Sequence, residues 1–65
     1  MMPLSPTEFR VVQLLAQGAR HEEIRLRLDV SKNAITSALK RARDKAGATS
    51  NEHLIALLYR TGVLR

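Results

Sequence analysis

Apolar residues recur every three or four positions along the chain, the spacing that places them on one face of an α-helix. The sequence has no run of strict apolar and polar alternation, which would be typical of a half-buried strand. This pattern predicts four short helices and no sheet, over residues 6–17, 21–28, 32–46 and 50–61. We expect residues 1–65 to form a single all-α domain, because a chain of this length has room for only one.

Side chains that cap helix N-termini precede three of the predicted helices. Ser5 followed by Glu8 has the spacing of a capping box, in which each side chain accepts a hydrogen bond from the other residue's backbone N–H. Ser31 holds the capping place before the third helix. Before the fourth helix the sequence leaves two caps open, Thr49 and Ser50. These signals support the predicted helix starts.

The third predicted helix has one apolar and one polar face. Ile35, Leu39, Ala42 and Ala46 follow one another at helical spacing and form its inward stripe. The opposite face holds Lys32, Asn33, Thr36, Ser37, Lys40, Arg41 and Arg43.

The fourth predicted helix is crowded with aliphatic residues. Leu54, Ile55, Leu57 and Leu58 fall within five positions, so they wrap more than one face of a helix. One face can serve the core of the domain. The other would be exposed, and an exposed apolar patch on a small domain indicates a partner.

The positive charge of the chain is concentrated in one segment. The formal net charge is +5. Residues 31–45 hold five Lys and Arg side chains against Asp44, a balance of +4, and the rest of the chain is nearly neutral. A concentrated basic segment is typical of an element that binds a polyanion. The alternative is an ordinary solvated helix face.

Two helices joined by a tight turn, the second of them basic and polar on its outer face, describe a helix-turn-helix. An α-helix fits the major groove of B-DNA, where its outward side chains meet base edges. We therefore expect Asn33, Thr36, Ser37 and Lys40 to contact bases. The Lys and Arg side chains that flank them, Arg41, Arg43 and Lys45, are expected to contact phosphates.

The sequence also resembles a known family, the LuxR-type (GerE-like) DNA-binding domain. The resemblance covers residues 4–64 without gaps. The residues that carry it are LSPTE at 4–8, LLAQG at 14–18, EI at 23–24, Leu28, VS at 30–31, KAG at 45–47 and GVL at 62–64.

The resemblance implies a four-helix domain in which the third helix reads the major groove and the fourth helps to pair two copies. By position it assigns Thr36, Ser37 and Lys40 to bases. It brings Arg20, His21, Ser31, Lys32 and Asn33 towards phosphates. On the fourth helix the expected dimer contacts are Leu54, Leu57, Leu58 and Thr61.

The chain departs from the family pattern at the start of the third helix. The family usually has Thr-Val-Lys-x-His there, whereas residues 34–38 read AITSA, so the customary Lys and His are replaced by Thr36 and Ala38. Glu22 also stands where the family often has Lys. The segment at residues 38–45 is similar to the end of region 4 of bacterial sigma factors, a related helix-turn-helix. The glycine at residue 47 and the fourth helix favour the LuxR-type interpretation.

Other classes of function find little support in the sequence. There is no cysteine, which excludes a disulfide scaffold and Cys-ligated metals. The chain has no glycine-rich phosphate loop and little room for a substrate pocket, so we expect no catalysis, cofactor or metal. His21 and His53 lack HExxH spacing. No apolar run reaches the roughly 18 residues of a membrane helix, and no signal peptide is evident.

Two hypotheses follow from these patterns. The first is a regulator of transcription that binds double-stranded DNA in a sequence-specific manner as a homodimer. It would be cytoplasmic and associated with the nucleoid, and of bacterial or phage origin. The second is a protein-interaction module with weak or no DNA binding, which pairs with a larger LuxR-type regulator or an RNA polymerase subunit. The missing Lys and His and the aliphatic fourth helix motivate the second hypothesis.

Overall fold

The computed structural model describes residues 3–65. They form four helices, α1 (Pro6–Ala16), α2 (His21–Leu28), α3 (Lys32–Ala46) and α4 (Asn51–Arg60), and no strand. The predicted all-α fold class with four helices is therefore confirmed. The helix ends lie within one residue of those predicted from the apolar spacing.

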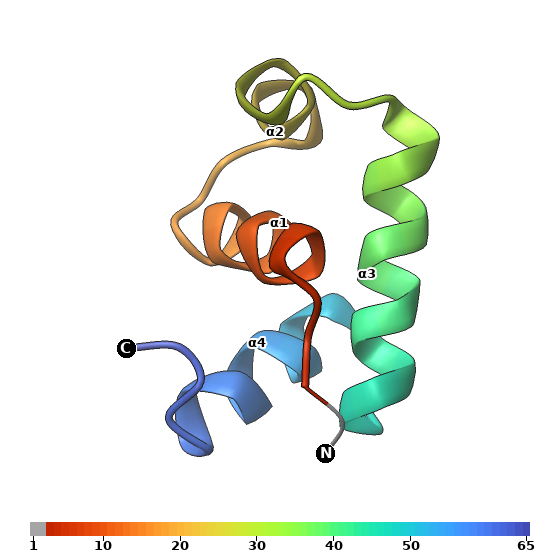
Figure 1. Cartoon of the computed structure of the whole chain (residues 1–65). Helices are drawn as coiled ribbons and strands as arrows, with labels where there is room; N and C mark the ends of the chain where they lie inside the picture. Colours follow the sequence, from red (N-terminus) through yellow and green to blue (C-terminus); the bar gives the residue numbers. More distant parts are fainter. Residues whose placement is uncertain (1–2) are drawn as a thin grey trace.

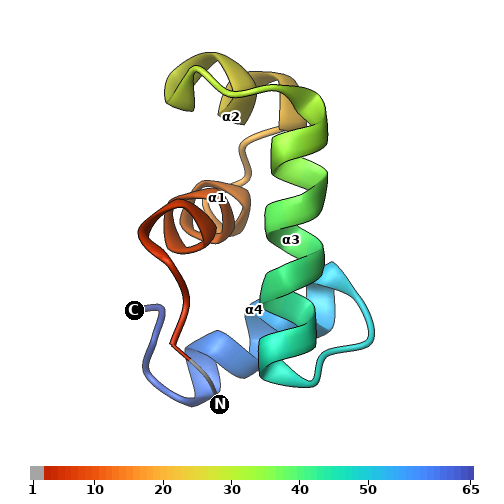
Figure 2. The same ribbon diagram turned by 45° about the vertical axis from the view of Figure 1, so that its right-hand side comes forward.

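Helix α3 is the longest helix and the scaffold of the domain. Figure 1 shows it upright, with α2, α1 and α4 arranged one below the other along the same side. The turned view in Figure 2 shows the same arrangement, and each of the three shorter helices packs on α3. The opposite side of α3 is consequently left open to solvent.

The core forms where the inward side of α3 meets the other helices. Ile35, Leu39 and Ala42 of the predicted inward stripe are completely or almost completely buried, whereas Ala46 is only partly covered. Ala38 is also fully buried, which the sequence analysis did not predict. The partners of this stripe are Val11, Val12 and Leu14 from α1, Ile24 from α2, Leu54 and Leu58 from α4, and Leu64.

The predicted capping interactions are present. Ser5 Oγ accepts a hydrogen bond from the Glu8 backbone N–H at 3.1 Å, and Glu8 Oε1 accepts one from the Ser5 N–H at 3.0 Å. Ser31 and Ser50 each accept a bond from the backbone N–H three residues further on. Of the two caps left open for α4, Ser50 is therefore the one used, and Thr49 is not.

The connection between α2 and α3 is tight because one residue leaves the helical conformation sharply. Asp29 adopts a left-handed backbone with φ of 53° and ends α2. Aspartate tolerates this conformation better than most residues, since its short side chain bonds locally. Two residues later Ser31 caps α3, so the two helices meet at an angle fixed by this turn.

The structure corrects the predicted dimer interface on α4. Leu54 and Leu58 have no exposed surface within the single chain, because they face α3 and complete its core. They are not available to a second copy, and this part of the prediction is wrong. Leu57 is partly exposed and Thr61 is exposed, so only these two of the four remain at the surface.

Candidate nucleic-acid interface

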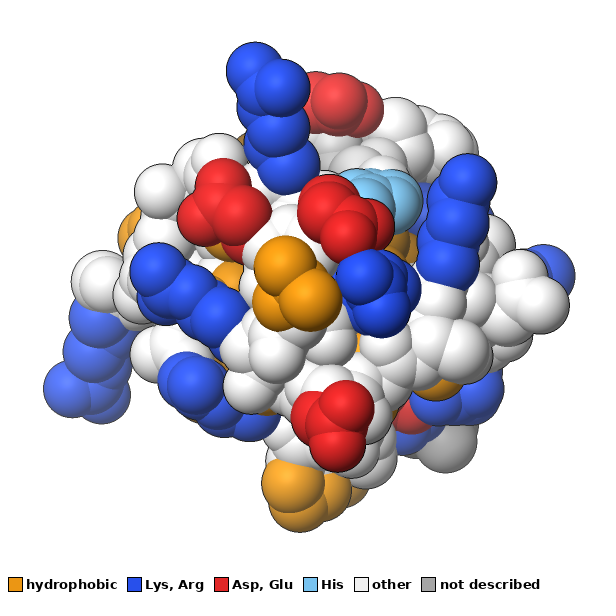
Figure 3. Space-filling model, turned by 90° about the horizontal axis from the view of Figure 1, so that it is seen from above, with side chains coloured by type: hydrophobic (Ala, Val, Ile, Leu, Met, Phe, Trp, Pro, Cys, Tyr) orange, Lys and Arg blue, Asp and Glu red, His pale blue; other side chains and the backbone are white. Residues whose placement is uncertain are grey.

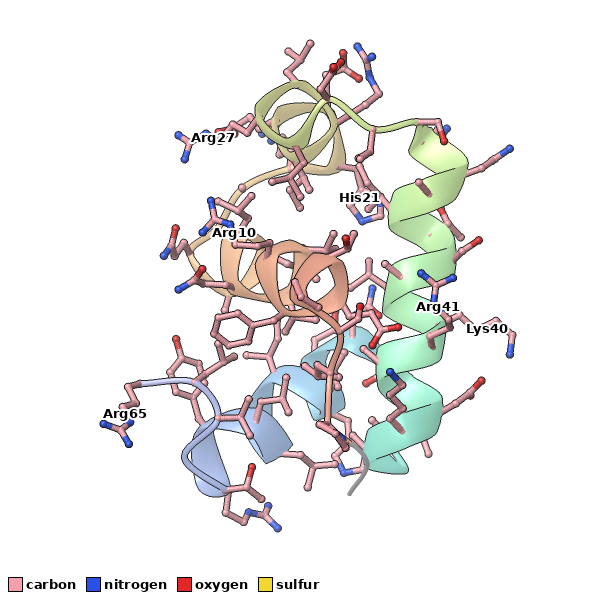
Figure 4. All side chains as sticks on the ribbon, viewed as in Figure 1. Arg10, His21, Arg27, Lys40, Arg41 and Arg65 are labelled. Carbon is pink, nitrogen blue, oxygen red and sulfur yellow. The ribbon has the colours of Figure 1, made fainter. Side chains whose placement is uncertain are left out.

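The open side of α3 carries a continuous row of exposed polar side chains, which we call the outward stripe. Each member has another member three or four residues away, so together they cover one side of the helix. Figure 4 shows Lys40, in the middle of this row, pointing away from the other three helices. The outward stripe consists of Asn33, Thr36, Ser37, Lys40, Arg41 and Asp44. The four predicted base contacts therefore all lie on the solvent side of α3.

The start of the outward stripe coincides with the N-terminus of α3. Lys32 is exposed there, beside the Ser31 cap. Thr36 donates its hydroxyl to the Lys32 backbone carbonyl at 3.2 Å, which fixes its side chain against the helix. The positive end of the helix dipole lies at the same place and favours an anion. Ser31, by contrast, already uses its hydroxyl as the cap.

Helix α2 contributes both signs of charge beside α3. Arg20 and His21 precede or open α2, and both are exposed. Figure 4 shows His21 on the side of α2 that faces α3. The Glu22 carboxylate accepts two hydrogen bonds from Arg25, the shorter of 2.6 Å. The opposite charges of these two side chains therefore compensate each other. Figure 3, the view onto α2, accordingly shows acidic and basic side chains interspersed rather than a basic patch.

A buried carboxylate from α1 faces the basic end of α3. Glu8 is only 2% exposed, and its two oxygens bind two cations of α3. Lys45 Nζ donates to Oε1 at 2.6 Å and Arg41 Nε donates to Oε2 at 2.9 Å. The Lys45 hydrogen bond is the largest of the contacts that lower the pKa of Glu8, which falls from 4.5 to about 2 although burial opposes the charged form.

Two further cations of α3, Lys40 and Arg43, also have partners. Lys40 pairs with Asp44 at 3.1 Å, with both side chains about two-thirds exposed, so water screens the pair and it separates easily. Arg43 Nη1 donates to Asn51 Oδ1 at 2.5 Å and joins the last turn of α3 to the first turn of α4. Arg43 therefore links α3 to α4 and also contributes a positive charge to this region.

The predicted phosphate contacts differ in how exposed they are. Arg20, His21, Ser31, Lys32 and Arg41 are exposed. Lys45 is different, since its side chain is 20% exposed and its ammonium group is turned to Glu8. The structure thus does not bring Lys45 into the outward stripe. Arg43 is half-buried towards α4.

The sequence analysis missed the role of Glu8 in this region. The capping box accounted fully for Glu8 within α1, so nothing local indicated a second function. Its cationic partners lie 33 and 37 residues further along the chain. A glutamate inside an otherwise apolar helical stripe is the one signal that could have drawn attention to it, because charged side chains are rarely buried without a partner.

Away from the outward stripe, the described residues form a small groove. This groove measures about 240 Å³ and lies between α1 and the C-terminal segment, with Phe9, Tyr59 and Leu64 in its walls. Small-molecule sites are usually larger than about 300 Å³. Residues 3–65 contain no cluster of three metal-ligating side chains. None of their helices has the length and apolar character needed to span a bilayer.

Comparison with known proteins identifies the domain. The model of the GerE family, described as bacterial regulatory proteins of the luxR family, matches residues 2–58. A search of curated proteins finds no match to the chain. The family match spans all of α1, α2 and α3 and most of α4, including the whole outward stripe. The chain therefore belongs to the luxR family of bacterial regulatory proteins.

Proposed function

We propose that this protein regulates transcription by binding double-stranded DNA in a sequence-specific manner, with α3 in the major groove. The observation that carries the proposal is the outward stripe, a row of short polar and long basic side chains on the side of α3 that no other helix covers. An α-helix with one free side is the element that the major groove admits. The site of action would be the nucleoid in the cytoplasm of a bacterium or a phage-infected cell.

Within the stripe, side-chain chemistry separates two roles. Asn33, Thr36 and Ser37 are short and would approach base edges closely, while Lys40 can reach the O6 and N7 acceptors of guanine. Releasing Lys40 from Asp44 costs little, because the pair is exposed. We assign phosphate contacts to Arg20, His21, Ser31, Lys32 and Arg41, and a long-range electrostatic contribution to Arg43 and Lys45.

We also propose that two copies pair through α4. Leu57 lies in α4 and Thr61, four residues later, caps its C-terminus; they are the predicted dimer contacts that the fold leaves at the surface. In a symmetric dimer the two α3 helices would lie about 34 Å apart, one turn of DNA, and would favour a palindromic site.

The test compares two charge reversals of equal size. Lys32→Glu with Lys40→Glu alters the outward stripe, and Arg10→Glu with Arg27→Glu alters side chains that Figure 4 places on the opposite side of the molecule. We expect the first variant to lose duplex binding at least about a hundredfold in a fluorescence polarisation assay, and the second to lose far less. Equal losses would show that only net charge matters and would overturn the assignment of α3.

A second function is favoured by the pairing of the α3 cations. Arg41 and Lys45 bind Glu8, Lys40 binds Asp44, and the position of the family's customary His is the buried Ala38. Such a surface is less cationic than its composition indicates. In this alternative the protein pairs with a larger LuxR-type regulator or an RNA polymerase subunit. Absence of binding to any duplex at low salt, together with capture of such a partner, would favour it.

A further inference from the structure

The carboxylate of Glu8 is bound on both oxygens. Oε1 accepts from the Ser5 N–H and from Lys45 Nζ, and Oε2 accepts from Arg41 Nε. The two cations differ in their exposure, since the Lys45 side chain is 20% exposed and the Arg41 side chain 54%. Lys45 also donates to the Pro3 carbonyl at 3.3 Å, so its ammonium group has a second partner in the segment before α1.

The charges of this cluster leave one positive charge facing outwards. Lys45 compensates the negative charge of Glu8 within the fold, and Arg41 is then the excess cation on the solvent side. A guanidinium group has five N–H donors, of which Arg41 uses one on Glu8. Within residues 3–65 its two terminal nitrogens make no hydrogen bond to the protein. Four donors therefore remain for a ligand.

We propose that Glu8 is a positioning residue for DNA binding, which holds Arg41 so that its terminal nitrogens meet a phosphate beside the outward stripe. This inference rests on the proposed DNA binding by α3. An arginine fixed through Nε has its planar fork oriented before the phosphate arrives, so less side-chain freedom is lost on binding. The contact with Glu8 need not break, because phosphate and carboxylate use different nitrogens.

The opposite role would make Glu8 an inhibitor that withholds Arg41 from DNA. The two roles predict opposite effects of Glu8→Gln. If Glu8 withholds Arg41, the substitution adds a free cation and strengthens DNA binding. If Glu8 positions Arg41, the substitution weakens binding even though the net charge becomes more positive. The half-exposed guanidinium and its unused terminal nitrogens favour positioning.

The experiment is a double-mutant cycle on duplex affinity with Glu8→Gln, Arg41→Ala and the combination, measured by fluorescence polarisation over a series of salt concentrations. The probe is a random-sequence duplex, because phosphate contacts do not depend on sequence. We expect Arg41→Ala to weaken binding about tenfold and to reduce the salt slope by about 1 in the natural protein. In the Glu8→Gln background the same change should weaken binding only about twofold. Equal effects in both backgrounds, or stronger binding by Glu8→Gln, would overturn the proposal.

Two further measurements keep the test decisive. If Glu8→Gln does not fold, Arg41→Lys replaces it, because this change keeps the charge at a half-exposed position and removes the Nε contact. It should weaken binding several-fold, and the matched Arg10→Lys should not; equal results would refute positioning. A natural protein that binds no duplex overturns the proposed function and this inference together. Binding that depends on Lys40 but shows no coupling between Glu8 and Arg41 overturns the inference alone.

Discussion

Replacing Glu8 by glutamine removes one buried charge and keeps the shape of the side chain. The glutamine side chain has the same length, and its oxygen can still accept the Ser5 N–H, since capping boxes use either residue. Lys45 then still faces the amide oxygen, but the amide NH2 group stands where Glu8 Oε2 accepted from Arg41 Nε, so the Arg41 contact is lost together with the negative charge. The substitution therefore measures what the charge and its contact with Arg41 contribute together to the free energy of unfolding.

The size of the effect follows from the pKa of Glu8. The pKa falls from 4.5 to about 2 in the folded chain. Each tenfold change in an acid dissociation constant is worth about 1.4 kcal/mol, so the drop corresponds to about 3 kcal/mol at neutral pH. Water screens the Arg41 contact, since that side chain is half exposed. We therefore expect Glu8→Gln to lower the free energy of unfolding by about 2 kcal/mol, a large share of what a small domain has.

The effect has a definite dependence on pH. The folded pKa lies below the unfolded value, so the ionised carboxylate stabilises the fold fully above pH 4.5. This contribution is lost as the pH falls from 4.5 towards 2, where the folded protein also takes up the proton. The difference between the natural protein and Glu8→Gln should therefore be constant near neutrality and shrink across this acidic range.

Urea unfolding followed by far-UV circular dichroism measures the difference at each pH. The control is Glu22→Gln, which removes an equally charged carboxylate from the exposed pair with Arg25 and should leave the urea midpoint unchanged. Identical midpoints for Glu8→Gln and the natural protein at neutral pH would refute the reasoning. A difference that persists undiminished at pH 2 would also refute it, because it would then not arise from the charge.

Three further substitutions test which side chains of α4 face the core and how α3 ends. Leu58→Asp should unfold the domain because Leu58 is fully buried, whereas Leu57→Asp should keep the helical circular dichroism signal and, if α4 forms the dimer seam, yield a monomer in analytical ultracentrifugation. Gly47→Ala should lower the free energy of unfolding by about 1 kcal/mol, since Gly47 ends α3 at φ of 71° with space around it, so the cost is backbone strain. An unchanged thermal midpoint for Gly47→Ala would contradict this assignment.

Local signals in the sequence predicted the helices well. Ser5, Ser31 and the glycine after α3 mark helix ends through interactions that involve only neighbouring residues, so the pattern of side chains is enough to place them. The polar flank of α3 could also be predicted, because an amphipathic helix turns its apolar stripe inwards and the rest outwards. The four predicted base contacts consequently lie where the sequence analysis expected them, on the solvent side of α3.

Contacts between distant residues could not be predicted in the same way. Four aliphatic residues within five positions of α4 do not show which of them face the core, and the structure selects Leu54 and Leu58. Ala38 was compared with a polar family position, although its spacing from Ile35 and Ala42 also fits the inward stripe. The binding of Lys45 by Glu8 depends on how α1 crosses α3, which no local pattern records.

Helix α3 carries the fold on one side and the outward stripe on the other. Side chains on the solvent side contribute little to packing, so exchanging them would leave the folding energy nearly untouched. Evolution or design could thus exchange Asn33, Thr36 and Ser37 without compensating changes in the core. Because a single helix provides both surfaces, a substitution that destabilises α3 would disrupt the core and the outward stripe together.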